Sequence, residues 1–182
     1  MMKRLFALVA ALLAAVWMPT PLSAQQAGSD SNVEARAGDL RIIHFWSTKP
    51  EEVRAALAQP DPQPIDMVNA AERNQLVQQF ILYGNCRRDP DGHCWLSATV
   101  DITAPDGTPY EDTLHFDALP LGPAVPRDTI GVAPGSMALV IEDGEQLGRY
   151  RIRLAVTDEI AVETAVSTIH LDIVEAGTSP TQ

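Results

Sequence analysis

The 182-residue chain has little basic charge, few aromatic residues and only two cysteines. Its 13 lysines and arginines face 24 aspartates and glutamates, which gives a formal charge of −11. Because nucleic acids and anionic membrane surfaces are bound mainly through Lys and Arg, this balance argues against both as partners. Two cysteines exclude a disulfide-dense miniprotein, and a hydrophobic content of 46% excludes a highly charged disordered chain. The composition is that of one ordinary globular domain.

The sequence also lacks the motifs of common catalytic and metal sites, because no H-x-H, H-E-x-x-H or G-x-S-x-G pattern occurs. Its histidines are scattered, and strand alternation predicts that His115 and His170 point outward. The segment Asp89-Pro90-Asp91-Gly92 comes nearest to a calcium loop, but it lacks the D-x-[DN]-x-[DN]-G pattern and the distal glutamate. We therefore predict that the protein is not an enzyme and has no catalytic residue, metal or cofactor.

The first 24 residues have the pattern of a Sec-type signal peptide. A basic Met1-Met2-Lys3-Arg4 precedes an uncharged run over 5–18, and prolines follow before Leu22-Ser23-Ala24. The run is shorter than the roughly 20 residues of a membrane span, so cleavage after Ala24 is favoured over an uncleaved anchor. No cysteine near the cleavage point forms a lipobox. We expect a periplasmic or secreted protein with no membrane span after cleavage.

The mature chain is predicted to hold one domain between two polar ends. Residues 25–37 are small and polar and are interpreted as a flexible leader, and residues 176–182 as a flexible tail. The folded domain is then expected over 38–175. No repeat of solenoid or propeller length is present in the sequence.

A period of two dominates the predicted domain. Residues 95–103 alternate apolar and polar side chains, and residues 148–158 do so with three arginines on the outer face. Further strands are expected at 40–46, 76–83, 113–116, 137–141 and 162–174. One short helix is predicted over 50–58, with Thr48 as a possible N-cap and the prolines at 60, 62 and 64 ending it. About seven strands and one helix near the N-terminus favour an all-β, antiparallel sandwich.

The two cysteines, Cys86 and Cys94, lie between two predicted strands. In an exported protein the simplest interpretation is a disulfide across a tight hairpin. A metal site would need more ligands with paired spacing, and a redox site would need a C-x-x-C motif. Those two alternatives and a pair of free thiols remain open but are less favoured.

The segment Leu147-Gly148-Arg149-Tyr150 through Asp158 resembles the penultimate strand of immunoglobulin-like and fibronectin-III-like sandwiches. In that family a tyrosine closes the corner between strands, so Gly148, Tyr150 and Asp158 are the expected fold corner. The cysteine segment followed by Pro105-Asp106-Gly107-Thr108-Pro109-Tyr110 resembles uncharacterised secreted proteobacterial proteins. The likeness covers about 76–173. The cysteines are closer in sequence than the inter-sheet bridge of antibody domains.

A candidate binding surface is predicted around the cysteines. Tyr83 and Trp95 flank them, and the loop carries Arg87, Arg88 and His93 on an otherwise acidic protein. The alternative is that Tyr83 and Trp95 form a cross-strand pair over the disulfide. A second candidate surface is the proline-rich segment 119–126, which could mask a sheet edge or offer one.

The expected function is an exported, non-catalytic binding or assembly-accessory module of the bacterial cell envelope. Its partner is expected to be another envelope protein. The alternative is a small envelope enzyme or inhibitor that acts on a peptide or glycan. The sequence leaves the oligomeric state open.

Overall fold

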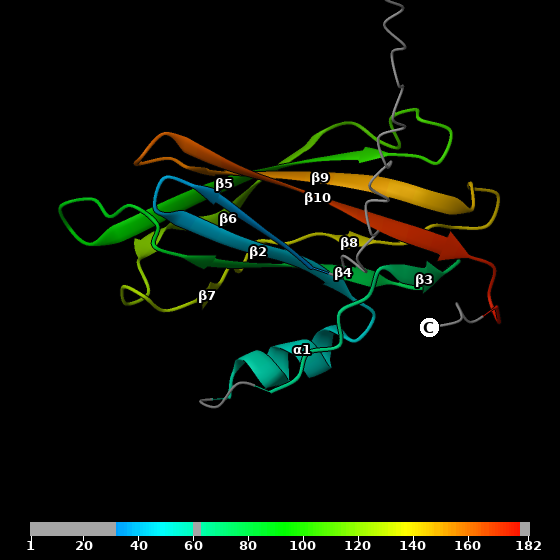
Figure 1. Ribbon diagram of the computed structural model, residues 1–182, viewed down its shortest axis with the longest axis horizontal. Helices are drawn as coiled ribbons and strands as arrows, with labels where there is room; N and C mark the ends of the chain where they lie inside the picture. Colours follow the sequence, from blue (N-terminus) through cyan, green and yellow to red (C-terminus); the bar gives the residue numbers. More distant parts are fainter. Residues whose placement is uncertain (1–31, 60–62, 179–182) are drawn as a thin grey trace, which may run out of the picture.

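A computed structural model describes residues 32–59 and 63–178, which form an immunoglobulin-like β-sandwich with one helix (Figure 1). Sheet A has the order β1-β2-β4-β7, and β8 also pairs with β4. Its strands are β1 (Asn32–Ala37), β2 (Leu40–Ser47), β4 (Val77–Gly84), β7 (Gly131–Val132) and β8 (Ala138–Leu139). The all-β sandwich that the sequence predicts is confirmed.

Sheet B has the order β3-β10-β9-β5-β6. Its strands are β3 (Ala70–Glu72), β5 (His93–Thr103), β6 (Leu114–Pro123), β9 (Gly148–Asp158) and β10 (Glu163–Val174). Every strand pair is antiparallel except β3 with β10. The described residues contain no helix long and apolar enough to cross a membrane.

The core lies between the two sheets and follows from strict alternation. On β9 and β10 every second side chain is buried, from Tyr150 to Val156 and from Ala165 to Ile173. The outer face of sheet B is polar instead, and it carries the ion pairs Arg149–Asp172 at 2.8 Å and Arg153–Asp101 at 3.2 Å. A register shift of one residue would bury arginines, so the pairing of β9 is well specified.

Sheet A is covered on its outer face as well, by α1 (Pro50–Leu57). Val53 packs there against Phe45, Phe80 and Leu82, and the two phenylalanine rings are stacked with centroids 5.3 Å apart. Figure 1 shows the helix beneath this sheet. Pro50 stands in the first turn of the helix, where a backbone N–H would have no partner within the helix, so the N–H that proline lacks is not missed. The N-cap is Lys49 and not the predicted Thr48, and no side chain caps the helix. The Lys49 N–H donates to the Ser47 hydroxyl, which lies before the helix.

Gly148 and Tyr150 of the predicted fold corner form a tyrosine corner, but Asp158 is not part of it, because it lies at the other end of β9. Gly148 begins β9 with φ +123°, a conformation that favours glycine, and its Cα lies against Pro105. The buried Tyr150 hydroxyl donates a hydrogen bond to the Gln146 carbonyl at 2.8 Å. The Tyr110 ring packs edge-on against Tyr150 at 5.5 Å. The bond back to the preceding turn is the contact that closes this corner in immunoglobulin-like domains.

A polar bridge crosses the core between the sheets. His44 on β2 is fully buried, with Nδ1 3.0 Å from the Ser167 hydroxyl on β10 and Nε2 3.1 Å from the Gln79 amide nitrogen on β4. Both hydrogen-bond partners of the ring are uncharged, and burial lowers the pKa of His44 to about 3. The imidazole is therefore neutral in the folded protein, with Nε2 accepting from Gln79 and Nδ1 donating to Ser167.

Three strands lie outside the sequence prediction. The leader was expected to extend to residue 37, but residues 32–37 form β1, which pairs with β2 along its whole length. β3 and β7 are two or three residues long. β6 continues through Pro123, so much of the proline-rich 119–126 segment is itself the edge strand of sheet B. The signal peptide and residues 25–31 lie outside the described residues.

Candidate functional site

The disulfide between Cys86 and Cys94 is present, but it does not close a hairpin. Cys86 follows β4 in sheet A, and Cys94 lies on β5 in sheet B. β4 and β5 do not pair, so the connection between them crosses from one sheet to the other. The bridge therefore joins the two sheets despite a sequence separation of 8. The predicted hairpin is wrong, and so is the expectation that cysteines this close in sequence cannot form an inter-sheet bridge.

Four connections meet at the disulfide end of the sandwich, at the left of Figure 1. They are the β1–β2 turn, the β4–β5 connection, the β6–β7 loop and the β9–β10 turn. Between them lies a cavity of about 740 Å³, which we call the end cleft. That volume is in the range of ligand pockets. Its lining residues are Gly38, Asp39, Leu40, Asn85, Cys86, Arg87, Arg88, Val125, Pro126, Arg127, Asp128, Asp158, Ala161 and Glu163.

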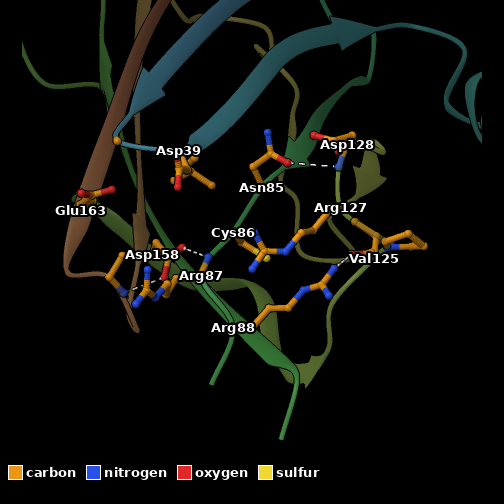
Figure 2. Close-up of a pocket in the computed structure, with 14 residues that line it drawn as sticks. Asp39, Asn85, Cys86, Arg87, Arg88, Val125, Arg127, Asp128, Asp158 and Glu163 are labelled. Atoms are coloured by element: carbon orange, nitrogen blue, oxygen red, sulfur yellow. Dashed lines mark hydrogen bonds between the residues drawn. The ribbon is translucent and has the colours of Figure 1, made fainter. Parts of the chain in front are cut away.

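The walls of the end cleft are fixed by bonds between different connections, shown as dashed lines in Figure 2. The buried Asp158 carboxylate accepts from the Arg87 N–H at 2.6 Å and also from the N–H groups of 160 and 161 in its own turn. The Asn85 amide oxygen accepts from the Asp128 N–H at 3.3 Å. The Arg88 guanidinium donates to the Val125 carbonyl at 2.6 Å. With the disulfide, these bonds tie together the connections that surround the cleft.

The arginines of the end cleft stand out by their lack of acidic partners. Seven of the eleven Lys and Arg side chains among the described residues form ion pairs. Within that part of the chain, the four without one are Arg87, Arg88, Arg127 and Arg151, and the first three line the end cleft. In a chain with a formal charge of −11, unpaired arginines would be expected to find carboxylates easily. Their grouping around one cavity therefore marks a candidate site for a polar ligand.

The end cleft also contains carboxylates, of which Asp39 and Glu163 lie away from Arg88 and Arg127, whereas Asp128 lies on the same side as these two arginines. Figure 2 shows Asp39 and Glu163 at the left and the two arginines at the right. A Cβ placed on Gly38 would lie 2.0 Å from the Glu163 carboxylate, so only glycine allows that carboxylate its position. Gly38 also has φ +51°, as a tight hairpin turn requires. Among the described residues, the Asp39 and Glu163 carboxylates form no ion pair with the arginines of the cleft.

The predicted binding surface is only partly assembled. Arg87 and Arg88 line the end cleft, whereas His93 and Trp95 are not among its lining residues. Trp95 is 39% exposed on the outer face of sheet B, where its indole N–H donates to Asp117 at 2.9 Å. Tyr83 was predicted on the surface but is 3% exposed, because it points into the core from β4. Tyr83 and Trp95 lie in different sheets, so the cross-strand pair does not form either.

Three potential metal ligands lie together in the loop next to the end cleft. Ligand atoms of Asp89, Asp91 and His93 are all within 4.8 Å of one another. One Asp89 oxygen already accepts from the main-chain N–H groups of Asp91 and His93, at 2.9 and 2.8 Å. The cluster thus forms the turn itself, and with three donors it falls short of the four of a structural zinc site.

The end cleft offers charge-assisted hydrogen bonding. Among the described residues, those that line it include no His, Ser, Thr, Lys or Tyr, and Cys86 is held in the disulfide. The groups left to contact a ligand are guanidinium groups and carboxylates, and both bind ligands through directional, charge-assisted hydrogen bonds. Sequence reasoning missed Asp39, Arg127 and Glu163. A signal for Arg127 was available, since it is a rare basic residue in a loop of an acidic chain.

The chain has only limited similarity to known proteins. No protein-family model and no curated protein matches the chain. Among solved structures, it is similar to the CARDB domain of a Pyrococcus furiosus protein in complex with di-metal ions, at 21% identity over 59% of this chain and 86% of that chain, with a TM-score of 0.36. It is also similar to a Niemann-Pick type C2 protein from the Japanese carpenter ant, at 12% identity over 79% of this chain and 95% of that chain, with a TM-score of 0.38.

Proposed function

We propose that the protein is an exported, non-catalytic binding or assembly-accessory module of the bacterial cell envelope, and that the end cleft is its binding site. The observation that carries this proposal is the grouping of Arg87, Arg88 and Arg127 around one cavity, where none of them has an acidic partner in the part of the chain that the structure describes. Arginine is enriched among the residues that dominate binding energy at interfaces. Its planar guanidinium retains its charge at any physiological pH and offers five N–H donors.

Rigidity supports a binding role for the cleft. Arg88 spends one donor on the Val125 carbonyl, so its guanidinium is already oriented and its other donors are free for a ligand. The disulfide and the Asp158 carboxylate fix the connection that carries Arg87 and Arg88. Less ordering entropy is lost on binding when the groups that make contact are held in advance.

Export is supported by two features of different kinds. The first 24 residues have the pattern of a signal peptide. The protein contains a disulfide, and disulfides form and persist mainly in oxidising compartments outside the cytosol. The partner we propose is another envelope protein that places a polar segment in the end cleft.

The test is cross-linked capture from envelope extract with the mature protein as bait, followed by binding of the purified partner. Arg88→Glu with Arg127→Glu is compared with Arg151→Glu, because Arg151 also lacks an acidic partner but lies on the outer face near the start of β9. We expect the double variant to lose the partner by at least about tenfold in affinity and Arg151→Glu to keep it. A partner retained by the double variant would remove the end cleft from the function.

A further inference from the structure

The end cleft carries charges of both signs in nearly equal number. Three arginines and four carboxylates line it, which is a formal charge of −1. The Asp158 carboxylate is occupied by three main-chain N–H groups. Three arginines are thus left with Asp39, Asp128 and Glu163, whose carboxylates make no ion pair among the described residues.

The balance of charge limits what the end cleft can attract. A polyanion would meet the arginines but would be repelled by the carboxylates, and by the formal charge of −11 on the whole chain. A cation would meet the reverse arrangement inside the cleft. A ligand with one charge of each sign can pair with both walls at once, and each pair would be a charge-assisted hydrogen bond.

We propose that the end cleft binds a zwitterionic peptide group, with a carboxylate held by Arg88 and Arg127 and an ammonium group held by Asp39 and Glu163. The inference rests on the proposed function, since it names the ligand class of the same site. Figure 2 places Asp39 and Glu163 on one side and Arg88 and Arg127 on the other, so a ligand with separated charges could reach both pairs. The same view places Asp128 beside Arg127 and Arg87 beside Asp158, so the separation of charge holds for these two pairs and not for every charge of the cleft.

The size of the cavity agrees with this ligand. If it were round, a volume of 740 Å³ would be about 11 Å across, and an extended chain of three residues is about 10 Å long. A tripeptide with free ends is therefore about as long as a round cavity of this volume is wide. The same charges occur in a partner segment that carries an acidic and a basic side chain near each other, so the two sources share one chemistry.

The test uses four matched peptides and isothermal titration calorimetry on the mature protein. The first is trialanine with free ends, the second its N-acetylated form, and the third its C-amidated form. The fourth is blocked at both ends and carries one internal Asp and one internal Lys. We expect a zwitterionic peptide to bind at least about tenfold more tightly than either singly charged form. Tight binding of the first peptide identifies chain ends as the source, and tight binding of the fourth identifies a partner segment.

Protein variants locate the two ends of the ligand. Arg88→Gln with Arg127→Gln should reduce the affinity for the free-ended peptide to that of the C-amidated peptide. Asp39→Asn with Glu163→Gln should reduce it to that of the N-acetylated peptide, and Arg151→Gln should change nothing. The melting temperature of each variant is measured first, and an unchanged value shows that the fold is intact.

Two results would overturn the inference. One is equal affinity for the zwitterionic and singly charged peptides, and the other is no binding of any of the four peptides. If capture of an envelope partner still depends on Arg88 and Arg127 in either case, the proposed function stands and only the ligand class is wrong. If peptide binding is found but capture is not affected by these arginines, the envelope partner is wrong and the ligand class stands.

Discussion

Lowering the pH from about 7.5 to about 5 tests whether the buried imidazole of His44 is neutral in the folded protein. Burial lowers its pKa to about 3, and its neighbours Ser167 and Gln79 carry no charge. In the unfolded chain a histidine titrates near its usual pKa of about 6.5. Between these two values the unfolded chain takes up a proton that the folded protein does not, so the free energy of unfolding falls as the pH is lowered.

The magnitude follows from the two pKa values. With a folded pKa of about 3, the loss between about pH 7.5 and about pH 5 is about 2 kcal/mol. This is a large share of the stability of an ordinary domain. The stabilisation is complete above the unfolded pKa, and the loss continues until the pH reaches the folded value.

The assay is urea unfolding at several pH values, for the natural protein and for His44→Asn. The variant is destabilised at every pH, but it has no imidazole at this position, so its stability should fall by about 2 kcal/mol less over the same range. Contributions from other titrating groups are common to both proteins and cancel in the difference. Equal pH dependence in the two proteins would refute the reasoning, because it would mean that His44 titrates alike in the folded and unfolded states.

Three other predictions concern the bonds that hold the sandwich together. Reduction of the bond between Cys86 and Cys94 should lower the free energy of unfolding by about 2.5 kcal/mol, measured in urea with and without dithiothreitol, and an unchanged midpoint would contradict it. Asp158→Ala should cost about 3 kcal/mol, because three main-chain N–H groups lose a charged acceptor, and a loss under about 1 kcal/mol would show that water replaces it. Tyr150→Phe should cost about 1 kcal/mol through the lost bond to the Gln146 carbonyl, and thermal unfolding that matches the natural protein would remove the corner from the stability argument.

The parts of the fold that could be predicted are those with a local signal. Most positions of β5 and β9 alternate apolar and polar residues, and such a pattern needs no knowledge of the neighbouring strands. The corner at Tyr150 also has a local signature, because its hydroxyl bonds only four residues upstream. Strands of two or three residues, such as β3 and β7, have no periodicity to detect and exist through their partners.

The cysteine connection shows where local reasoning ends. A segment of this length between two strands can return to the same sheet or cross to the other, and both paths use turn residues. Only the pairing of β4 with β2 and of β5 with β9 decides between them. The same limit applies to the end cleft, whose Asp39 and Arg127 come from two separate connections and whose Glu163 begins β10. Their meeting is a property of the topology.

The bonds that tie the cleft walls also separate its architecture from its recognition chemistry. At Arg87, Val125 and Asp128 the tie uses a main-chain atom, which any residue other than proline at 87 and 128 would supply. Side chains at 39, 87, 127 and 163 can therefore be exchanged without loss of those bonds. The end of the sandwich is in this sense a scaffold on which a library of side chains could be selected for new ligands, with the disulfide and the side chains of Asn85, Arg88 and Asp158 kept constant.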